Sequence, residues 1–325
     1  MKLAYLTTGR VPREDLTPRL GTSDRYLVSM AVLTASLALL VVPIMGRIGY
    51  KFLILQGVCI LTGFIVESGG ARLTKRTLNY FGPASWIIFP FLVPPGLPLW
   101  MSLVGLALSL VITQTLFGGF GRHVVHPAVF AQLIVMLNFP MVFNASFLGN
   151  FRRPFSGFSI YSSTSLTSMT DFDLLAIGRR LPLRAMLTGP HVGFPGEIFP
   201  GLVIIAGLLY IILGDVNIRT PLAFLATMVL ASMGGNILFP DKVLPAMQAV
   251  VGGSTLFFAF FIFTDHWTST KTKGGRLAAG VMAAFITIIV RSFSPISEGI
   301  VFAAMFNYAF GSLYDTIALA LRKKL

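Results

Sequence analysis

The hydroxyl-rich segment Tyr161-Ser162-Ser163-Thr164-Ser165-Leu166 holds the residue types in this chain that are best suited to chemistry. It lies in one long polar stretch, residues 144–198, with apolar runs on both sides. Ser and Thr side chains hydrogen-bond to nearby backbone groups and favour turns over buried helices, so we expect these hydroxyls on an accessible loop. Accessible hydroxyls can accept a covalent group or bind an anion. The alternative is a loop whose hydroxyls bond only to its own backbone.

The elements around this loop are those of a membrane protein. Apolar residues make up 55% of the 325 residues and charged residues only 11%, well below the charged fraction of soluble domains. Several apolar runs approach the roughly 20 residues that a helix needs to cross a bilayer. We therefore predict an all-α polytopic membrane protein with about ten transmembrane helices. The expected spans lie near 26–45, 49–67, 84–98, 101–117, 124–143, 199–214, 220–238, 246–265, 277–292 and 298–320.

The distribution of basic residues predicts the orientation in the membrane. Most of the 25 Lys and Arg residues fall in the N-terminal segment, the C-terminal segment and the short loops on that same side. Cytoplasmic loops collect Lys and Arg, so both termini are expected in the cytoplasm and the loop 144–198 outside. The net charge of +13 is explained in this way without a nucleic-acid partner. We expect a multi-pass protein of the cell's inner (cytoplasmic) membrane.

The predicted spans divide into five before the loop and five after it. An odd number of spans in each half gives the halves opposite orientations, which is typical of inverted repeats with a shared site near their interface. The predicted domains are residues 1–143, with the first five-helix repeat, the extracytoplasmic loop 144–198, and residues 199–325, with the second repeat. Prolines 94, 95 and 98 interrupt the third span, and such breaks survive in a membrane only where protein or a water-filled cavity covers them.

Several segments, in order along the chain, resemble the RnfD/NqrB family, the membrane flavoproteins of the Rnf and Nqr complexes. No one of them is specific, but together they extend over nearly all of the chain from about residue 50. They are Pro-Pro-Gly-Leu-Pro-Leu-Trp (94–100), Leu-Phe-Gly-Gly-Phe-Gly (116–121), His-Pro-Ala (126–128), Gly-Glu (196–197), Thr-Asp (264–265), Lys-Gly-Gly-Arg (273–276) and Pro-Ile-Ser-Glu-Gly-Ile-Val-Phe-Ala (295–303).

The resemblance implies a flavin site on the long loop. Members of the family carry FMN through a phosphoester bond to a threonine, and the aligned residue here is Thr164, beside Ser162 and Ser163. A flavin transferase, a separate protein, would make this bond. Ser162-Ser163 stands where the family has Gly-Ala, and Phe158 stands where an acidic residue is usual. Arg152 and Arg153 in the same loop could bind the flavin phosphate, or could instead dock an acidic partner or lipid head groups.

The resemblance also implies a second flavin, such as riboflavin, near the cytoplasmic side. The glycine run Gly118, Gly119 and Gly121 precedes a helix predicted to open near His123. Glycines let the backbone approach a flat ligand, and a helix N-terminus favours an anionic or acceptor edge. The alternative is close helix packing by small residues.

Acidic residues at membrane depth are candidates for an ion path, because ionisable groups there are costly. The candidates are Asp265, Glu298 and Asp315. His123 and His126 have the spacing of metal ligands, but no third ligand is evident and we expect no metal. The single cysteine, Cys59, lies in an apolar span, so the chain alone cannot hold an iron–sulfur cluster by cysteines.

These features together predict a membrane electron-transfer subunit of an Rnf/Nqr-type ion-translocating oxidoreductase complex. We expect no independent catalysis and no catalytic residue, since no nucleophile–base pair is evident; the partners would be the other membrane and flavoprotein subunits. One alternative is a small-solute channel or transporter of similar inverted-repeat architecture. Another is a scaffold subunit that has lost its flavin. The sequence leaves open whether Na⁺ or H⁺ moves, and which molecules donate and accept electrons.

Overall fold

The structure is a computed structural model that describes residues 23–75, 83–117, 124–146, 193–214, 216–240, 242–265, 268–294 and 298–324. Within these residues every regular element is helical. The predicted all-α polytopic class is confirmed.

The described part before the long loop begins with two long helices. α2 (Ser23–Ile48) and α3 (Lys51–Leu73) are joined by a tight turn in which Gly49 has φ 84°. Glycine suits this turn because it adopts positive φ without a steric penalty. The elements that follow are α4 (Pro83–Ile88), the 3-10 turn η1 (Phe89–Phe91), α5 (Leu99–Leu110), the π-helical turn η2 (Val111–Thr115), α6 (Pro127–Asn138) and α7 (Pro140–Ala145).

The described part after the loop has a similar order of long and broken helices. Pro127, Pro140 and Pro200 each begin a helix, at a position where the missing N–H of proline has no intrahelical partner to lose. The second set of elements is α10 (Pro200–Leu213), α11 (Arg219–Leu238), α12 (Ala246–Val251), α13 (Thr255–Phe257), the π-helical turn η4 (Phe258–Ile262), α14 (Lys273–Phe293) and α15 (Gly299–Lys324).

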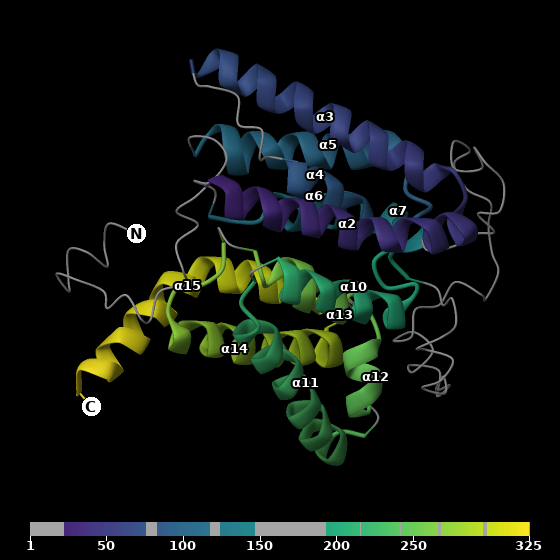
Figure 1. Cartoon of the computed structure of the whole chain (residues 1–325). Helices are drawn as coiled ribbons and strands as arrows, with labels where there is room; N and C mark the ends of the chain where they lie inside the picture. Colours follow the sequence, from purple (N-terminus) through teal and green to yellow (C-terminus); the bar gives the residue numbers. More distant parts are fainter. Residues whose placement is uncertain are drawn as a thin grey trace.

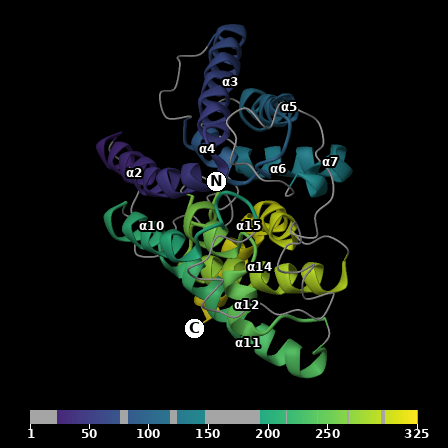
Figure 2. The same cartoon turned by 90° about the vertical axis from the view of Figure 1, so that its right-hand side faces the viewer.

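The two sets of helices form two adjoining halves. Figure 1 shows α3 to α7 above and α10 to α15 below, with α2 lying against α10 at the junction. Figure 2, turned by 90°, shows the same division, with α3 at one edge of the molecule and α11 at the opposite edge. Helices α6 and α15 also touch across the junction. The division into inverted repeats stays a prediction, although the order of elements agrees with it.

Each half has one element that breaks inside the helical layer. In the first half, helix ends at Phe91 and the chain continues without helix to Pro98, as the prolines predict. In the second half, the expected span 246–265 is interrupted at Gly252-Gly253-Ser254, where Gly253 has φ 66°. This second break was not predicted, although two adjacent glycines in an apolar run mark a site where the chain can leave the helix.

The backbone groups freed by the first break find partners inside the protein. The Gly96 N–H donates to the carbonyl of Ser146 at 2.9 Å, and the Gly196 N–H donates to the carbonyl of Phe91 at 3.0 Å. The ammonium group of Lys51, which is buried, donates to the carbonyl of Leu97 at 3.2 Å. Non-helical backbone therefore lies where protein covers it, as a membrane interior requires.

The outer faces of the long helices are apolar. Among the described residues, four helices are long and apolar enough to cross a membrane, namely Val28–Gly46, Lys51–Leu73, Arg219–Leu238 and Lys273–Phe293, and three shorter apolar helices accompany them. Side chains such as Val42, Phe64 and Leu230 are more than half exposed. A soluble protein rarely exposes so much contiguous apolar surface, whereas lipid would cover it.

Most predicted helix boundaries agree with the structure to within a few residues. The largest shifts are at the ends of the second and third spans, expected at residues 67 and 98, where the helices end at Leu73 and Phe91. The fifth span was expected from residue 124 with a helix opening near His123. The described helix opens at Pro127, and α6 and α7 divide the span at Phe139. The boundary differs because His126 has extended backbone, φ −66° and ψ 120°, the conformation favoured before a proline.

Candidate functional site

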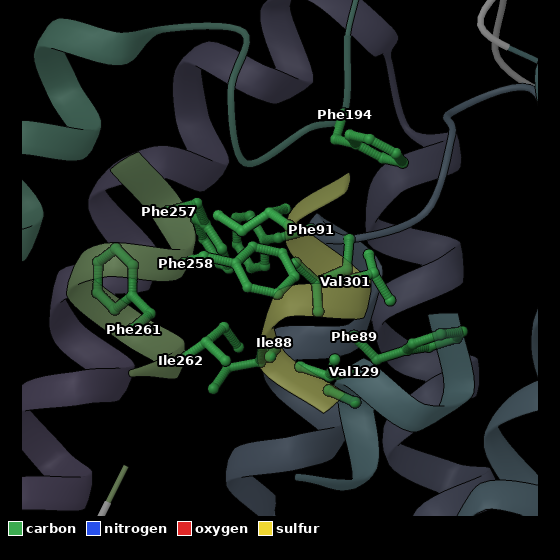
Figure 3. Close-up of a cluster of buried hydrophobic side chains, with 14 of the residues drawn as sticks. Ile88, Phe89, Phe91, Val129, Phe194, Phe257, Phe258, Phe261, Ile262 and Val301 are labelled. Carbon is green, nitrogen blue, oxygen red and sulfur yellow. The ribbon is translucent and has the colours of Figure 1, made fainter. Parts of the chain in front are cut away.

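The two halves meet on a layer of aromatic and aliphatic side chains. The Phe91 ring of η1 stacks on the Phe257 ring of α13, with centroids 5.6 Å apart, and Phe257 lies 4.9 Å from Phe261. Figure 3 shows these rings among Ile88, Phe89, Phe258, Ile262, Val129 of α6 and Val301 of α15. All of these side chains are buried. The interface between the broken helices is therefore filled by apolar side chains.

The valines of this layer belong to a short internal sequence match between the two halves. Ala-Val-Phe-Ala at 128–131 and Ile-Val-Phe-Ala at 300–303 lie at the starts of α6 and α15, the last long helix of each half. Aligning them places His126 and Glu298 at equivalent positions, one residue before each helix. Both side chains are buried. From the sequence alone, this match could have predicted that Val129 and Val301 lie in equivalent positions of the two halves.

A polar cluster adjoins the break in the second half. The Ser254 hydroxyl donates to Oε2 of Glu298 at 3.2 Å, and Nη1 of Arg291 donates to Oγ1 of Thr255 at 2.8 Å. The Arg291 side chain also lies close to Gly299, the residue after Glu298, because a Cβ built at Gly299 would lie 3.2 Å from Cγ of Arg291. The Glu298 carboxylate and both hydroxyls are buried. Charged groups in a low-dielectric interior need such partners. The sequence singles out Glu298 but does not predict that Arg291 lies near it.

The last six residues of the long loop, 193–198, are all buried. Within them the Phe194 N–H donates to Oε1 of Glu197 at 2.9 Å. Gly196 approaches the aromatic layer so closely that a Cβ built there would lie 2.7 Å from Cδ2 of Phe257. The pair Gly196-Glu197, one of the segments that carry the family resemblance, lies in this turn, and α10 begins three residues after Glu197, at Pro200.

The other two ion-path candidates stabilise local backbone. The Asp315 carboxylate accepts hydrogen bonds from the N–H groups of Lys271 and Thr272 and from the Thr272 hydroxyl, at 2.7–3.2 Å. Thr272 in turn caps α14 by accepting from the Gly275 N–H at 2.9 Å. Oδ2 of Asp265 accepts from the N–H and hydroxyl of Thr268. These contacts give both aspartates a structural role at the ends of helices.

Basic residues lie next to these aspartates. Burial lowers the pKa of the Lys271 ammonium group, and the Arg276 guanidinium lowers it further, while Asp265 and Asp315 act in the opposite direction. Nε of Arg276 donates to the carbonyl of Thr270 at 2.9 Å. The start of α14 is thus a compact, mixed-charge region.

Near the residue run 118–121, the structure describes one buried side chain that suits a polar ligand. Gln114, in η2, is 1% exposed, and neither its amide nitrogen nor its amide oxygen has a hydrogen-bond partner among the described residues. Buried polar groups nearly always have a partner, so this carboxamide requires one that the described residues do not supply. Nearby, the Ser109 hydroxyl donates to the carbonyl of Pro127 at 2.6 Å and ties α5 to the start of α6.

All of the predicted flavin residues lie outside the described residues, namely Thr164, Ser162, Ser163, Arg152, Arg153, Gly118, Gly119 and Gly121. His123, considered above as a metal ligand, also lies outside them. Among the residues that are described, no group of three or more His, Cys, Asp or Glu side chains could hold a metal ion. Cys59 is buried.

The fold and its interface define a polytopic helical membrane protein in which two halves meet on broken helices, the arrangement in which transporters and related proteins place their central sites. Comparison with known families then identifies the group. The chain matches the NQR2, RnfD, RnfE family over residues 18–320, and it belongs to that family. The resemblance seen in the sequence is confirmed.

Several relatives carry one name, that of the D subunit of the ion-translocating oxidoreductase complex. The chain is 26% identical to the Cronobacter sakazakii protein of this name over 292 residues, 79% of this chain and 83% of that protein. It is 26% identical to the Rhodobacter capsulatus protein over 298 residues, 83% of each chain. For the Aeromonas hydrophila protein, also so named, the identity is 27% over 280 residues, 78% of this chain and 80% of that protein.

Proposed function

We propose that this chain is the membrane electron-transfer subunit of an Rnf/Nqr-type ion-translocating oxidoreductase complex. The observation that carries the proposal is the family match over residues 18–320, together with relatives named as the D subunit of such a complex. The oxidoreductase activity belongs to the complex, and this chain contributes a membrane-embedded path for electrons. Its partners are the other membrane and flavoprotein subunits.

FMN bound covalently to Thr164 is the cofactor we propose for the loop. A bound flavin would supply the electron transfer, since the protein supplies position and exclusion of water rather than redox chemistry. Four serines lie close to Thr164 in the chain, Ser162, Ser163, Ser165 and Ser168, and they favour an accessible backbone that a flavin transferase can reach. Arg152 and Arg153 would bind the phosphate.

A second flavin near the glycine run 118–121 is supported by Gln114. A carboxamide offers both a donor and an acceptor, which matches the edge of a flavin ring, whose carbonyl and N–H groups alternate. Gln114 is buried four residues before Gly118. In this proposal Gln114 orients the ring edge while the glycines leave room for its face.

The three acidic candidates for an ion path differ in their surroundings. Of the three acidic candidates, Asp265 and Asp315 already accept several local hydrogen bonds, whereas Glu298 is buried beside the break in the second half and accepts a hydrogen bond from Ser254. Glu298 is therefore the residue to test first for a role in Na⁺ or H⁺ movement. The proposed orientation places both termini in the cytoplasm and the loop 144–198 outside the inner membrane.

The aromatic layer favours a redox subunit over a passive channel. A small-solute channel needs a path between the halves that polar molecules can follow. In this structure Phe91, Phe257 and Phe261 occupy that position with stacked or tilted rings, and the side chains around them are apolar.

In-gel flavin fluorescence of the denatured chain tests the proposal. Wild-type protein purified from its native membrane should give a fluorescent band, and Thr164→Val should remove it while the protein still assembles in the membrane. Thr167→Val is the matched control and should keep the fluorescence. A dark wild-type band from fully expressed protein would contradict covalent FMN, and a band that persists in Thr164→Val would contradict the choice of Thr164.

A further inference from the structure

The last helix, α15, extends past the helix that it packs against. Nδ2 of Asn307 donates to the carbonyl of Ala279 in α14 at 2.9 Å, and the Asp315 carboxylate accepts from the Thr272 N–H, directly before α14, at 2.9 Å. The two helices therefore run antiparallel, with Asp315 level with the start of α14. Residues 316–324, the extension of α15, continue beyond that level for about 14 Å. Figure 1 shows this end of α15 projecting past α14.

One face of α15 is apolar along this stretch, and most of that face is exposed. The Phe306 and Phe310 rings stack with their centroids 4.3 Å apart, and Leu313, Ile317 and Leu321 follow at intervals of three or four residues. This spacing places the five side chains on one face of the helix. Phe310 is 40% exposed and Leu321 is 60% exposed. The apolar face therefore begins beside α14, which is apolar enough to cross a membrane, and continues into the extension.

The extension ends in three basic residues, Arg322, Lys323 and Lys324. It contains no acidic residue. The acidic residue directly before it, Asp315, already accepts hydrogen bonds from the backbone at the start of α14. An apolar face beside a group of Lys and Arg residues is the pattern of a helix that lies at a membrane surface and attracts anionic head groups.

We propose that the extension binds the bilayer surface at this end of the molecule, with Leu321 in the head-group region and the three basic residues near the phosphates of anionic lipids. Leu321 lies about 9 Å beyond Asp315 along the helix, and the head-group region adds roughly 5–8 Å on each side of the hydrocarbon core. Lipid is the occupant because the apolar face is continuous with the face beside α14 that lipid would cover, and because the charges that follow it are all positive. This inference goes beyond the proposed function and holds whether or not the loop carries a flavin.

Nitroxide labels on the full-length protein in lipid nanodiscs test this proposal. Cys59→Ala removes the single cysteine, so that Leu321→Cys or Thr316→Cys can carry one label. In nanodiscs of phosphatidylcholine with phosphatidylglycerol, the label at Leu321 should collide more with O₂, which concentrates in the membrane, than with a water-soluble nickel chelate. Thr316, exposed on another face of the helix, is the matched control. Its label should show the opposite preference, although Thr316 lies closer to the level of Asp315.

Removing the charges separates binding to anionic lipid from apolar insertion alone. In the same nanodiscs, Arg322→Gln combined with Lys323→Gln and Lys324→Gln should lower the ratio of immersed to water-exposed label at Leu321 by about tenfold or more. Nanodiscs of phosphatidylcholine alone should lower this ratio in the same way. Arg72→Gln, which neutralises a basic residue in the last turn of α3, should leave the ratio unchanged.

Three results would overturn the proposal. They are equal immersion of the Leu321 label with and without phosphatidylglycerol, an unchanged ratio in the triple variant, and a crosslink to protein instead of phospholipid when a photoreactive benzoylphenylalanine replaces Leu321 in native membranes. If the triple variant does not assemble in the membrane, salt decides: a high NaCl concentration screens the charges and should release the Leu321 label, and unchanged immersion would overturn the proposal.

Discussion

Gly196 and Phe91 are joined by a backbone hydrogen bond of 3.0 Å that connects the end of the long loop to the first half of the molecule. The donor lies in the buried turn that ends the long loop, and the acceptor ends the helical part of a broken element. Only a residue without a side chain fits on the donor side, because a Cβ at Gly196 would meet both the Phe257 ring and the Phe91 carbonyl. This contact therefore requires glycine at position 196.

Gly196→Ala should destabilise the protein by about 2 kcal/mol, because the added methyl group must displace a stacked ring or break the hydrogen bond. The measurement is thermal unfolding of the purified protein in one detergent. Gly234→Ala is the control: a Cβ at Gly234, inside α11, meets no atom within 4 Å, so the change should be neutral or stabilise by up to about 1 kcal/mol. Equal effects of the two changes would contradict the close approach at Gly196.

Lys51→Met should destabilise the protein by about 1–3 kcal/mol, because the substitution leaves a buried acceptor without its donor. The Lys51 ammonium group donates to the carbonyl of Leu97, in the non-helical chain before α5. Lys51→Arg keeps a donor and should recover part of the loss. Unfolding measured in the same detergent checks both variants, and an unchanged Lys51→Met protein would show that this bond contributes little.

Gln132→Met should keep or increase stability, by up to about 1 kcal/mol, because an apolar side chain of similar size removes a polar group that lacks compensation. Gln132, in α6, is fully buried, and its carboxamide has no hydrogen-bond partner among the described residues. Ser109→Ala, which deletes a hydroxyl bonded to Pro127, should instead lose about 1 kcal/mol. Thermal unfolding compares the two variants, and a marked loss in Gln132→Met would reveal a polar partner for this side chain.

Lys75→Gly should stabilise the protein by about 1 kcal/mol, because the left-handed conformation is costly for a residue with a Cβ and is free of that penalty for glycine. Lys75 follows α3 with φ 52°, the one non-glycine residue with positive φ in the described part of the chain. Arg72→Gly, inside the last turn of α3, should destabilise by about 1 kcal/mol. The unfolding temperature reports both changes, and loss of stability in Lys75→Gly would argue against this backbone conformation.

Sequence patterns predicted the helices well because long apolar runs have few alternatives in a membrane. They predicted the break around Pro94 and Pro95, since proline removes a backbone donor, but not the break at Gly253, because glycine is also common within membrane helices. Glycine signals a break only together with its tertiary surroundings, here the aromatic layer on Phe257.

The candidate site was predicted less completely. Glu298 was singled out because an acidic residue at membrane depth is unusual, yet its neighbour Arg291 was counted only as one of the basic residues. Nothing local links Arg291 to Thr255, which lies 36 positions earlier in the chain; the fold brings Nη1 of Arg291 within 2.8 Å of the Thr255 hydroxyl. Asp315 met the same criterion as Glu298, but its hydrogen bonds to Lys271 and Thr272 identify a helix cap.

The π-helical turn Phe258–Ile262 sets the rotational phase of the chain that follows it. The Phe263 N–H bonds to the carbonyl of Phe258, five residues back, at 2.9 Å, so this turn holds one residue more than an α-helical turn would. Each residue of an α-helix turns the chain by about 100°. Shortening this turn by one residue would swing Thr264 and Asp265 about a quarter of the way around the axis while Phe257 stayed against Phe91. The extra residue therefore sets the direction of the Thr264 and Asp265 side chains independently of Phe257, which stays packed in the aromatic layer.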